Sequence, residues 1–409
     1  MESIFIQIAS YRDPELIPTL DDLLLNASHP ERLTICVAHQ YDEKDKWDSL
    51  EKYKNDSRFI VIEIPHLESG GACWARNQVQ QHYDNQDYTL QLDSHHRFIK
   101  GWDVRCIDML KDLQEKGHSK PLLTSYIPSY KPSNDPAERH NKPWGMSFDR
   151  FTPEGVVFFL PYYIDSNTTE PIPARFYSAH FAFTLGVFCK EVQHDPLFYF
   201  HGEEITIGVR AFTHGYSLFH PHEVLAWHEY TREGRTKHWD DHSSWGTHNN
   251  QAHQRTRLLL GVDGQVCTPC NKNMFQGYDI GTVRTLKEYE LYAGIRFKDR
   301  TLTQSCISNI DPPGDLSDTF LLKFKHAIDL NKSFFPEKDY NFAALVFEDI
   351  NNKEVYRQDI SKQEIDEYLN GSSDSFTVWR EYNGPKPHHW ILWPNSAHKG
   401  WGLKTTVNL

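Results

Sequence analysis

The sequence has no run of about 18 or more apolar residues, the length that a helix needs to cross a bilayer. Residues 1–6 have the pattern of a short strand and not of a basic region followed by a long apolar segment. Internal repeats and low-complexity tracts are also missing. We therefore expect no membrane span and no secretory signal, and the expected location is the cytoplasm.

Positive charge is scarce, because 43 Lys and Arg stand against 56 Asp and Glu, for a formal net charge of -13. Proteins that bind nucleic acids broadly present a basic surface to the phosphates, so this balance argues against a nucleic-acid partner. A protein of this charge that binds an anionic nucleotide would need a metal ion or a local group of arginines.

Cysteine is limited to seven scattered residues, an odd number that fits a reducing compartment. Only Cys267 and Cys270 have the spacing of a metal or redox pair. A structural zinc site needs further ligands, which could come from His238, His242 or His248. Otherwise the two cysteines are unpaired buried thiols.

Four short apolar runs have the length of buried strands, at residues 4–9, 33–38, 58–65 and 88–92. Helical patterns separate them at residues 16–25, where Asp13 is the expected cap, and at residues 72–81. This alternation predicts an α/β fold with a parallel, doubly wound sheet, in which ligands bind outside the carboxyl ends of the strands.

The second half of the chain is less regular. Residues 128–173 are rich in Pro, Ser and Asn, which predicts a long loop with a strand or hairpin at residues 155–160. Residues 311–314 (Asp-Pro-Pro-Gly) indicate a domain boundary. Strand-length runs after it suggest a small all-β domain at residues 316–409.

Asp93 and His95 are candidate metal ligands because they follow the apolar run 88–92 directly. Residues two apart on an extended chain point to the same side, so both could face one ion. A carboxylate and an imidazole can hold a divalent cation that neutralises a diphosphate leaving group. The alternative is that Asp93 is a solvated carboxylate and His95 one of 23 histidines.

Three further blocks of sequence stand in a recognisable order around this pair. They are residues 71–77 (Gly-Ala-Cys-Trp-Ala-Arg-Asn), residues 200–204 (Phe-His-Gly-Glu-Glu) and residues 227–229 (Trp-His-Glu). Together with Asp93 and His95, they resemble the GT-A glycosyltransferases. The most similar family is that of the cytoplasmic hydroxyproline N-acetylglucosaminyltransferases and their bacterial relatives, and the polypeptide N-acetylgalactosaminyltransferases are more distant.

This resemblance implies a Rossmann-like GT-A domain with a mixed, mostly parallel sheet at residues 1–310. Its nucleotide-binding half would be residues 1–125 and its acceptor half residues 126–310. The implied reaction moves a sugar from a UDP-sugar, with UDP-N-acetylglucosamine as the first choice, to a hydroxyl of a protein or glycan, with retention of the anomeric configuration. Mn²⁺ or Mg²⁺ would be held by Asp93, His95 and His228.

Several residues at the strand ends are candidates for binding the nucleotide. Ser10, Tyr11 and Arg12 would frame the uridine, and Asp42 is a weaker candidate. Arg12 and Arg76 could contact the pyrophosphate or the base. For Arg76, an ion pair with a carboxylate at a helix or strand end is an equal alternative.

Glu203 and Glu204 are candidate catalytic residues that, being adjacent, should face different directions. One is expected to hold hydroxyl groups of the donor sugar or the acceptor, and the other to cap the following helix. His222 is the alternative third metal ligand, and His96 is expected to be structural.

Two other functions stay open on the sequence alone. A metallohydrolase would use the same ligands to activate water, but it should show further carboxylate or His ligands near Asp93, and none is evident. A carbohydrate-binding protein without catalysis is the other possibility. The presence of Asp93, His95 and Glu203 argues against it.

Overall fold

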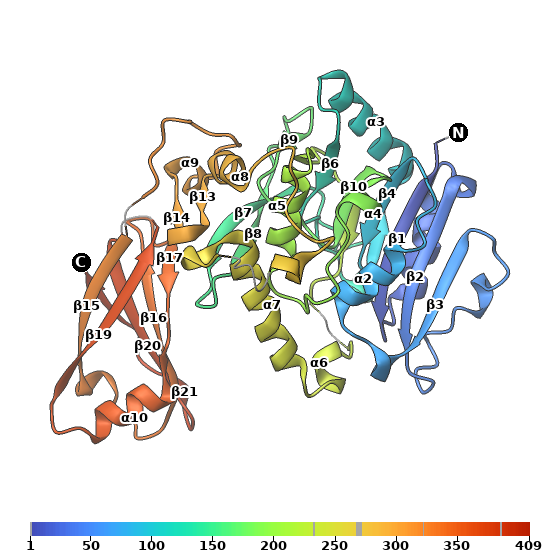
Figure 1. Cartoon of the computed structure of the whole chain (residues 1–409). Coiled ribbons are helices and arrows are strands. Elements are labelled where there is room, and N and C mark those ends of the chain that lie inside the picture. The colour runs from blue at the N-terminus through green and yellow to red at the C-terminus, as the bar shows by residue number, and fades with distance from the viewer. Residues whose placement is uncertain (1, 232–233, 267–271, 322, 385–386) are drawn as a thin grey trace.

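The computed structural model describes residues 2–231, 234–266, 272–321, 323–384 and 387–409 (Figure 1). Eight of the strands between Ile4 and His220 form one large sheet. The strands from Lys323 onwards form separate sheets in a second lobe at the other end of the molecule. Within these ranges, no helix combines the length and the apolar character that a membrane crossing requires.

The large sheet has the strand order β3-β2-β1-β4-β10-β6-β11-β9. β1 to β4 run parallel, whereas β10 is antiparallel to both of its neighbours and β9 is antiparallel to β11. The predicted α/β class with a mixed, mostly parallel sheet is therefore confirmed. The strands are β1 (Ile4–Tyr11), β2 (Leu33–Tyr41), β3 (Phe59–Pro65), β4 (Tyr88–Leu92), β6 (Pro121–Thr124), β9 (Ile172–Pro173), β10 (Phe181–Leu185) and β11 (Ser217–His220).

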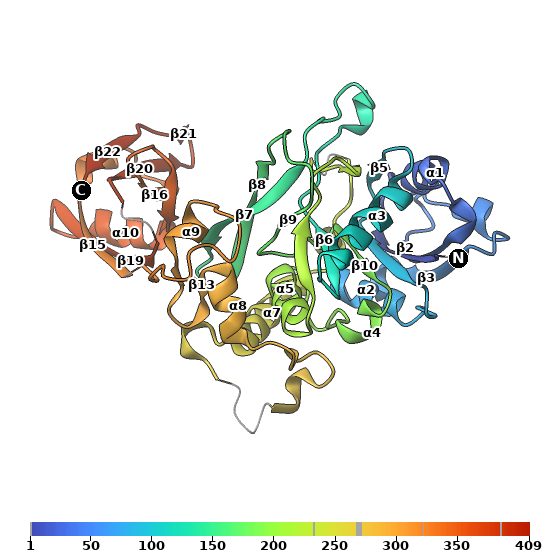
Figure 2. The ribbon, with the colours of Figure 1, turned by 90° about the horizontal axis from the view of Figure 1, so that it is seen from above.

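Helices cover both faces of this sheet. Successive residues of β1 point to opposite sides, so this strand contributes to a separate core on each face. Ile6 packs in one core with α1 (Leu16–Asn26) and α3 (Trp102–Glu115), and Phe5 packs in another with α2 (Ala72–Gln80). Figure 2 shows α1 and α3 on one side of the strands and α2 on the other. This burial explains why the predicted strands are apolar on both faces.

β1 and β2 are longer than the apolar runs that predict them. Ser10 pairs with His39, and Tyr11 pairs with Gln40, so backbone pairing continues after the hydrophobic signal has ended. The prediction that Asp13 caps α1 is wrong, because the N-cap residue is Glu15. The Asp13 carboxylate accepts a hydrogen bond from the Glu15 backbone nitrogen at 2.9 Å and is otherwise turned towards the end of β4.

Two small antiparallel sheets lie beside the large one. β5 (His96–Phe98) pairs with β12 (Ala226–His228), which places His228 opposite His96. β7 (Trp144–Phe151) and β8 (Val157–Tyr163) form a hairpin that is longer than the predicted segment at residues 155–160.

The second core surrounds α5 (Glu203–Thr213), of which ten of 11 residues are buried. Ile205, Ile207 and Val209 pack there with residues of β7, β8, α7 and α8. The remaining elements up to residue 307 are α4 (Phe188–Glu191), α6 (His238–Asp241), α7 (Trp245–Leu260), α8 (Leu286–Ala293), β13 (Ile295–Arg296), β14 (Thr301–Leu302) and α9 (Gln304–Ile307).

The C-terminal lobe is β-rich and has its own core, which includes Ile328, Leu345 and Leu392. It also contains one helix that the sequence did not predict, α10 (Lys362–Asn370), which is fixed by a capping box between Ser361 and Glu364. One two-stranded sheet joins β15 (Lys323–Asn331) and β19 (Ser375–Asn383). The six-stranded sheet holds β16 (Tyr340–Glu348), β17 (Glu354–Arg357), β18 (Ile360–Ser361), β20 (His389–Ser396), β21 (Gly400–Trp401) and β22 (Thr405–Asn408).

Candidate functional site

Asp93, His95 and His228 meet where β4 ends. Asp93 and His95 follow β4 directly, and the pairing of β12 with β5 brings His228 to them from far along the chain. The Nε2 atoms of His228 and His95 lie 3.4 Å and 3.7 Å from Asp93 Oδ2. One ligand atom from each residue lies within 4.8 Å of the others. This compact set of one carboxylate and two imidazoles fits a divalent cation.

His95 is held in place by a buried carboxylate, Asp13. Asp13 Oδ2 lies 2.7 Å from His95 Nδ1 and accepts a hydrogen bond from Ser94 Oγ at 2.7 Å. Arg235 adds an ion pair to Asp13 at 3.1 Å. Arg235 Nη1 also contacts His95 Nδ1. These contacts fix the imidazole ring so that its Nε2 atom faces Asp93. Burial raises the pKa of Asp13, but the charges of His95 and Arg235 outweigh it and lower this pKa to about 2.

Arg76 joins Asp93 to Glu203. It lies on α2, with Nη2 donating to Asp93 Oδ1 at 2.7 Å and Nη1 contacting Glu203 Oε1. The sequence left two interpretations of Arg76 open, contact with the nucleotide and an ion pair with carboxylates. The structure contains the ion pair. Burial raises the pKa of Asp93, but the hydrogen bond with His228 and the charge of Arg76 prevail, and this pKa lies well below its ordinary value. Asp93 is thus an anion, the form in which a carboxyl group ligates a metal.

Glu203 and Glu204 begin α5 and face different directions, as predicted. Glu203 contacts Arg76 and the thiol of Cys73. Glu204 accepts hydrogen bonds from the Ala179 backbone nitrogen and the Tyr126 hydroxyl, both at 2.9 Å. The N-cap residue is Gly202 with φ 94°, where a Cβ would also collide with Thr256 Oγ1.

Burial raises the pKa of Glu204 to about 7. Its carboxyl group therefore keeps its proton in the folded chain at pH values where the unfolded chain has lost it. The stabilising contribution is full below the ordinary pKa of about 4.5 and is lost as the pH rises towards 7.

Glutamine stays neutral at all of these pH values, so we expect the free energy of unfolding of Glu204→Gln to depend less on pH than that of the original chain. From pH 5 to pH 8 the free energy of unfolding of the original chain should fall relative to that of the variant by about 2–3 kcal/mol. Denaturant unfolding at several pH values measures the difference, with the exposed Glu51→Gln as the control. Parallel pH profiles of the two chains would show that Glu204 has an ordinary pKa.

A cavity of about 330 Å³ connects these groups. Its charged and imidazole-bearing lining residues include Arg76, Asp93, Glu203, Glu204 and His228, and its aromatic lining residues include Tyr126, Phe158, Phe159, Phe200 and Tyr230. Aromatic faces can stack on sugar rings, and carboxylates can accept hydrogen bonds from sugar hydroxyls. A larger cavity of about 820 Å³ lies between the hairpin turn and the C-terminal lobe, and none of the predicted site residues lines it.

Apart from Arg76 on α2, the residues predicted to bind the nucleotide lie at the ends of β1 and β2, on the same sheet edge as Asp93. Arg12 pairs with Asp45 at 2.7 Å, with Asp241 at 2.9 Å and with Asp42 at 3.3 Å. Tyr11 donates a hydrogen bond to Asp241, and Ser10 is fully buried with a hydroxyl group that has no partner in the described part of the chain. A phosphate that approached Arg12 would have to displace one of these carboxylates.

The structure distinguishes the remaining histidine candidates by their positions. His228, and not His222, lies with Asp93 and His95. His96 is fully buried with Nδ1 3.0 Å from the Asp93 carbonyl oxygen, which agrees with a structural role. The proposed zinc pair Cys267 and Cys270 lies outside the described residues.

Sequence reasoning missed two supporting residues, Asp13 and Arg235. Asp13 was assigned to the helix cap because it precedes Pro14, although its position just after β1 also places it at the ligand-binding edge of the sheet. Arg235 lies in a polar segment without any periodic signal. Its role follows from the ion pairs that it makes with Asp13 and Glu229 and from its contact with His95 Nδ1.

Comparison with known families agrees with the motifs. A family model described as Glycosyltransferase (GlcNAc) matches residues 3–59 and 49–299, and this confirms the resemblance found in the sequence. A search of the curated proteins gave no match.

Among solved structures, GalNAc-T7 with UDP, GalNAc and Mn²⁺ is similar with a TM-score of 0.46 and 12% identity, covering 70% of this chain and 54% of that one. Residues 1–349 of S. aureus TarS with UDP-GlcNAc have a TM-score of 0.36 and 15% identity, covering 59% of this chain and 61% of that one. This chain thus spans only about half the length of the GalNAc-T7 structure.

Proposed function

The chain belongs to the glycosyltransferase (GlcNAc) family, and from this premise we propose that it is a metal-dependent enzyme that transfers a sugar from a UDP-sugar to a hydroxyl group of a protein or glycan. N-acetylglucosamine is the first choice of sugar. The observation that carries the proposal is the convergence of Asp93, His95 and His228 at a cavity that Glu203 and Glu204 also line. We further propose residues 1–310 as the catalytic domain and residues 316–409 as an accessory domain.

Asp93, His95 and His228 would hold Mn²⁺ or Mg²⁺. The fit rests on the donor set, because Asp93 is an anion and the Nε2 atoms of both histidines face its Oδ2. A bound divalent ion would supply Lewis-acid neutralisation of the diphosphate charge. Mixed oxygen and nitrogen ligation favours Mn²⁺ over Mg²⁺, which prefers oxygen alone.

The chain's own residues have distinct tasks in this proposal. Arg76 orients the Asp93 carboxylate, and Asp13 orients His95. Ser10, Tyr11, Arg12 and Asp42 frame the uridine at the neighbouring strand ends. Glu204 holds hydroxyl groups of the donor sugar or the acceptor inside the cavity, and Glu203 holds Arg76 in place. The acceptor hydroxyl attacks from the face that UDP leaves, so the anomeric configuration is retained.

The proposal is tested by measuring UDP release from a panel of UDP-sugars, with Mn²⁺ and with EDTA. We expect release that depends on Mn²⁺, is fastest with UDP-N-acetylglucosamine and is stimulated by a hydroxylated acceptor. Release of free sugar alone, unaffected by every acceptor, would instead indicate a metallohydrolase. Absence of both UDP binding and turnover would reject an enzymatic function.

Asp13→Asn tests the arrangement around His95, because it keeps the side-chain size and removes the charge. Loss of such a supporting contact weakens metal binding by about 10–100-fold. We expect the dissociation constant for Mn²⁺ to rise by that factor. It is measured by titrating the protein with Mn²⁺ and following free Mn²⁺ by electron paramagnetic resonance. Asp21→Asn on the exposed side of α1 is the control, and equal Mn²⁺ affinity in both variants would remove Asp13 from the site.

A further inference from the structure

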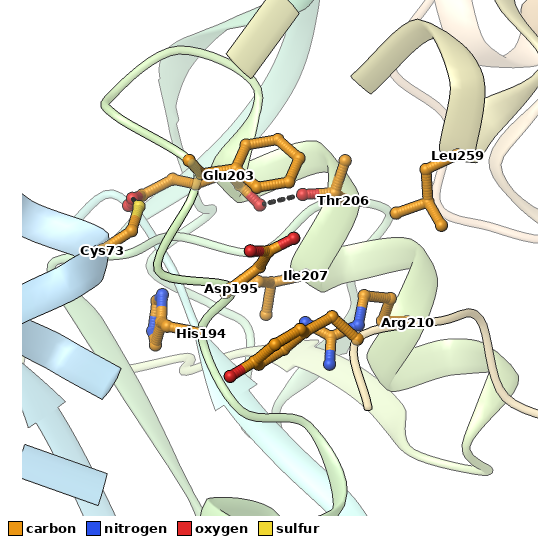
Figure 3. Close-up of a pocket in the computed structure, with 10 residues that line it drawn as sticks. Cys73, His194, Asp195, Glu203, Thr206, Ile207, Arg210 and Leu259 are labelled. Carbon is orange, nitrogen blue, oxygen red and sulfur yellow. Dashed lines mark hydrogen bonds between the residues drawn. The ribbon is translucent and has the colours of Figure 1, made fainter. Parts of the chain in front are cut away.

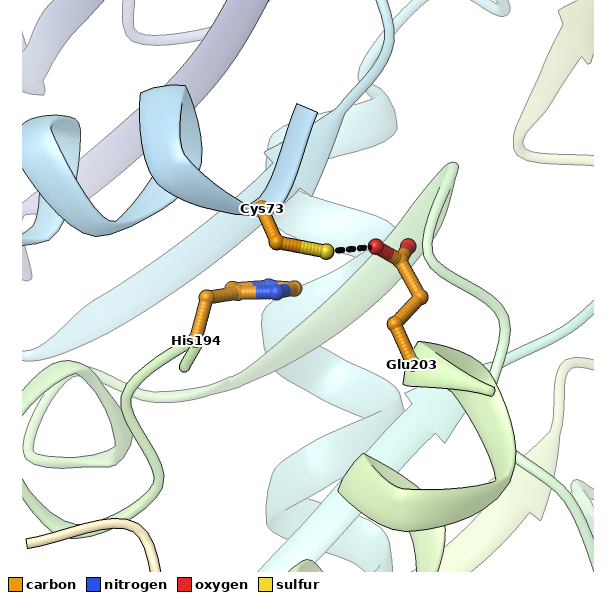
Figure 4. Close-up of side chains that lie close together, drawn as sticks. All are labelled: Cys73, His194 and Glu203. Carbon is orange, nitrogen blue, oxygen red and sulfur yellow. Dashed lines mark hydrogen bonds between the residues drawn. The ribbon is translucent and has the colours of Figure 1, made fainter. Parts of the chain in front are cut away.

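A second group of possible metal ligands lies deeper in the protein, on the other side of Glu203 from Asp93. Cys73 comes from α2, His194 from the segment after α4, and Glu203 from the start of α5. The exposed fractions of these residues are 0%, 0% and 6%. One ligand atom from each lies within 4.8 Å of the others (Figure 4). None of the roles assigned to the first site accounts for Cys73 or His194.

The hydrogen bonds around His194 define which ring nitrogen is free. Gln91 donates from Nε2 to the Ala179 carbonyl oxygen at 2.5 Å, so its Oε1 is an acceptor facing His194 Nε2, also at 2.5 Å. The proton of the neutral imidazole is therefore on Nε2, and Nδ1 carries a lone pair. Burial lowers the pKa of His194 well below its ordinary value, so the ring stays neutral.

His194 Nδ1 is buried without a hydrogen-bond partner in the described part of the chain. A buried acceptor that lacks a partner is unfavourable, and such an atom commonly marks the place of a bound water or ion. A small space of about 10 Å³ is lined by residues that include Cys73, His194, Asp195, Glu203 and Arg210 (Figure 3). That volume suits a single water or a single metal ion.

We propose that this space holds a Zn²⁺ ion, with Cys73 Sγ, His194 Nδ1 and Glu203 Oε2 as its three protein ligands. Thiolate and imidazole ligands are the combination that zinc prefers, whereas Mn²⁺ and Mg²⁺ favour oxygen. On binding, the Cys73 S–H bond breaks, an S–Zn bond forms, and the proton leaves to solvent. The thiolate and the carboxylate then balance the two charges of the ion.

The surrounding charges are compatible with this ion. Arg76 contacts the other Glu203 oxygen, Oε1, so Oε2 remains available for a metal. Asp195 is paired with Arg255. Arg210 also lines the space and is turned to the Gln193 carbonyl oxygen, to which it donates at 2.6 Å. Burial lowers its pKa to about 10, so it stays cationic at neutral pH and the two anionic ligands must offset its charge as well. The ion would link α2, the segment around His194 and α5, and so hold Arg76 and Glu203 in their mutual geometry. The proposal does not depend on which sugar is transferred.

The test is the zinc content of the full-length protein, expressed with zinc and measured by mass spectrometry after dialysis. An Asp93→Ala background removes the first site, so that only the buried ion is counted. We expect one zinc per chain, falling to roughly a tenth or less in Cys73→Ser and in His194→Gln. Cys106→Ser, at a buried thiol on α3, is the matched control and should keep its zinc.

Two further readouts separate ligation from misfolding. Growth with cobalt should give a thiolate-to-cobalt absorption band that disappears in Cys73→Ser, while circular dichroism shows that the variant is folded. Protein with no zinc and no cobalt band would overturn the proposal and leave the space to a water. Zinc that is lost in Cys270→Ser but kept in Cys73→Ser would overturn it as well.

Discussion

Sugar transfer should fall by at least roughly 1,000-fold when Asp93 is replaced by asparagine, because a cation that stabilises the departing diphosphate contributes several kcal/mol. The Nε2 atoms of His95 and His228 face Asp93 Oδ2. With asparagine in its place, this group of three ligands would contain no negative charge. Asparagine can still accept the hydrogen bond from Arg76, so the fold should be kept. The rate of UDP release at saturating UDP-sugar, with and without added Mn²⁺, measures the effect.

The matched control is Asp84→Asn, an exposed aspartate in the loop before β4. It removes the same charge from the same part of the chain and should leave the rate unchanged within a factor of about two. If Asp93→Asn were as active as Asp84→Asn, Asp93 would have no part in metal binding. If the variant lost activity together with its cooperative thermal transition, the loss would be one of folding, and Asp93→Ser would be the second variant.

Replacing Arg76 by methionine should destabilise the protein by about 3–5 kcal/mol, the usual cost of leaving a buried charge without its partner. Arg76 is 6% exposed and contacts Asp93 and Glu203 from one guanidinium group. Methionine fills similar space, so the change comes from charge more than from lost volume. Denaturant unfolding at pH 7 gives the free energy of unfolding, and sugar transfer should fall in parallel.

Arg105→Met is the control, since its ion pair with Glu223 is exposed and should be worth no more than about 1 kcal/mol. The double variant Arg76→Met, Glu203→Gln should lose less stability than the two single variants added together, because the second change removes the unpaired charge. Additive losses would mean that Arg76 and Glu203 are not coupled.

Local sequence patterns predict the positions of β1, β2, β3 and β4 well. β1, β2 and β4 are mostly buried on both faces, so their apolar runs mark their positions directly, as β4 shows at residues 88–92, whereas β3 at the sheet edge is mostly half-buried. The strand ends were less clear, because Ser10 and Tyr11 pair in the sheet without being apolar. α10 was missed because its core contact is carried mainly by Ile365, too little for a periodic signal.

The candidate site was predicted where its residues are close in sequence, as Asp93 and His95 are. His228 could be assigned only through the resemblance, since no spacing relates it to Asp93 and the pairing of β12 with β5 brings it there. The role of Asp13 and the bridge made by Arg76 depend on side-chain directions that the sequence does not encode in any short pattern. The same is true of Cys73 and His194, which are 121 residues apart by their numbers and meet only because α2 and the segment after α4 pack together.

The central claim is that Asp93, His95 and His228 hold the metal ion of a UDP-sugar transferase. The most direct measurement is a crystal structure with UDP and Mn²⁺, in which anomalous scattering locates the manganese. We expect one manganese peak in contact with Asp93 Oδ2 and the Nε2 atoms of His95 and His228, with the UDP diphosphate beside it. Manganese bound elsewhere, or UDP bound without any ion at these residues, would contradict it.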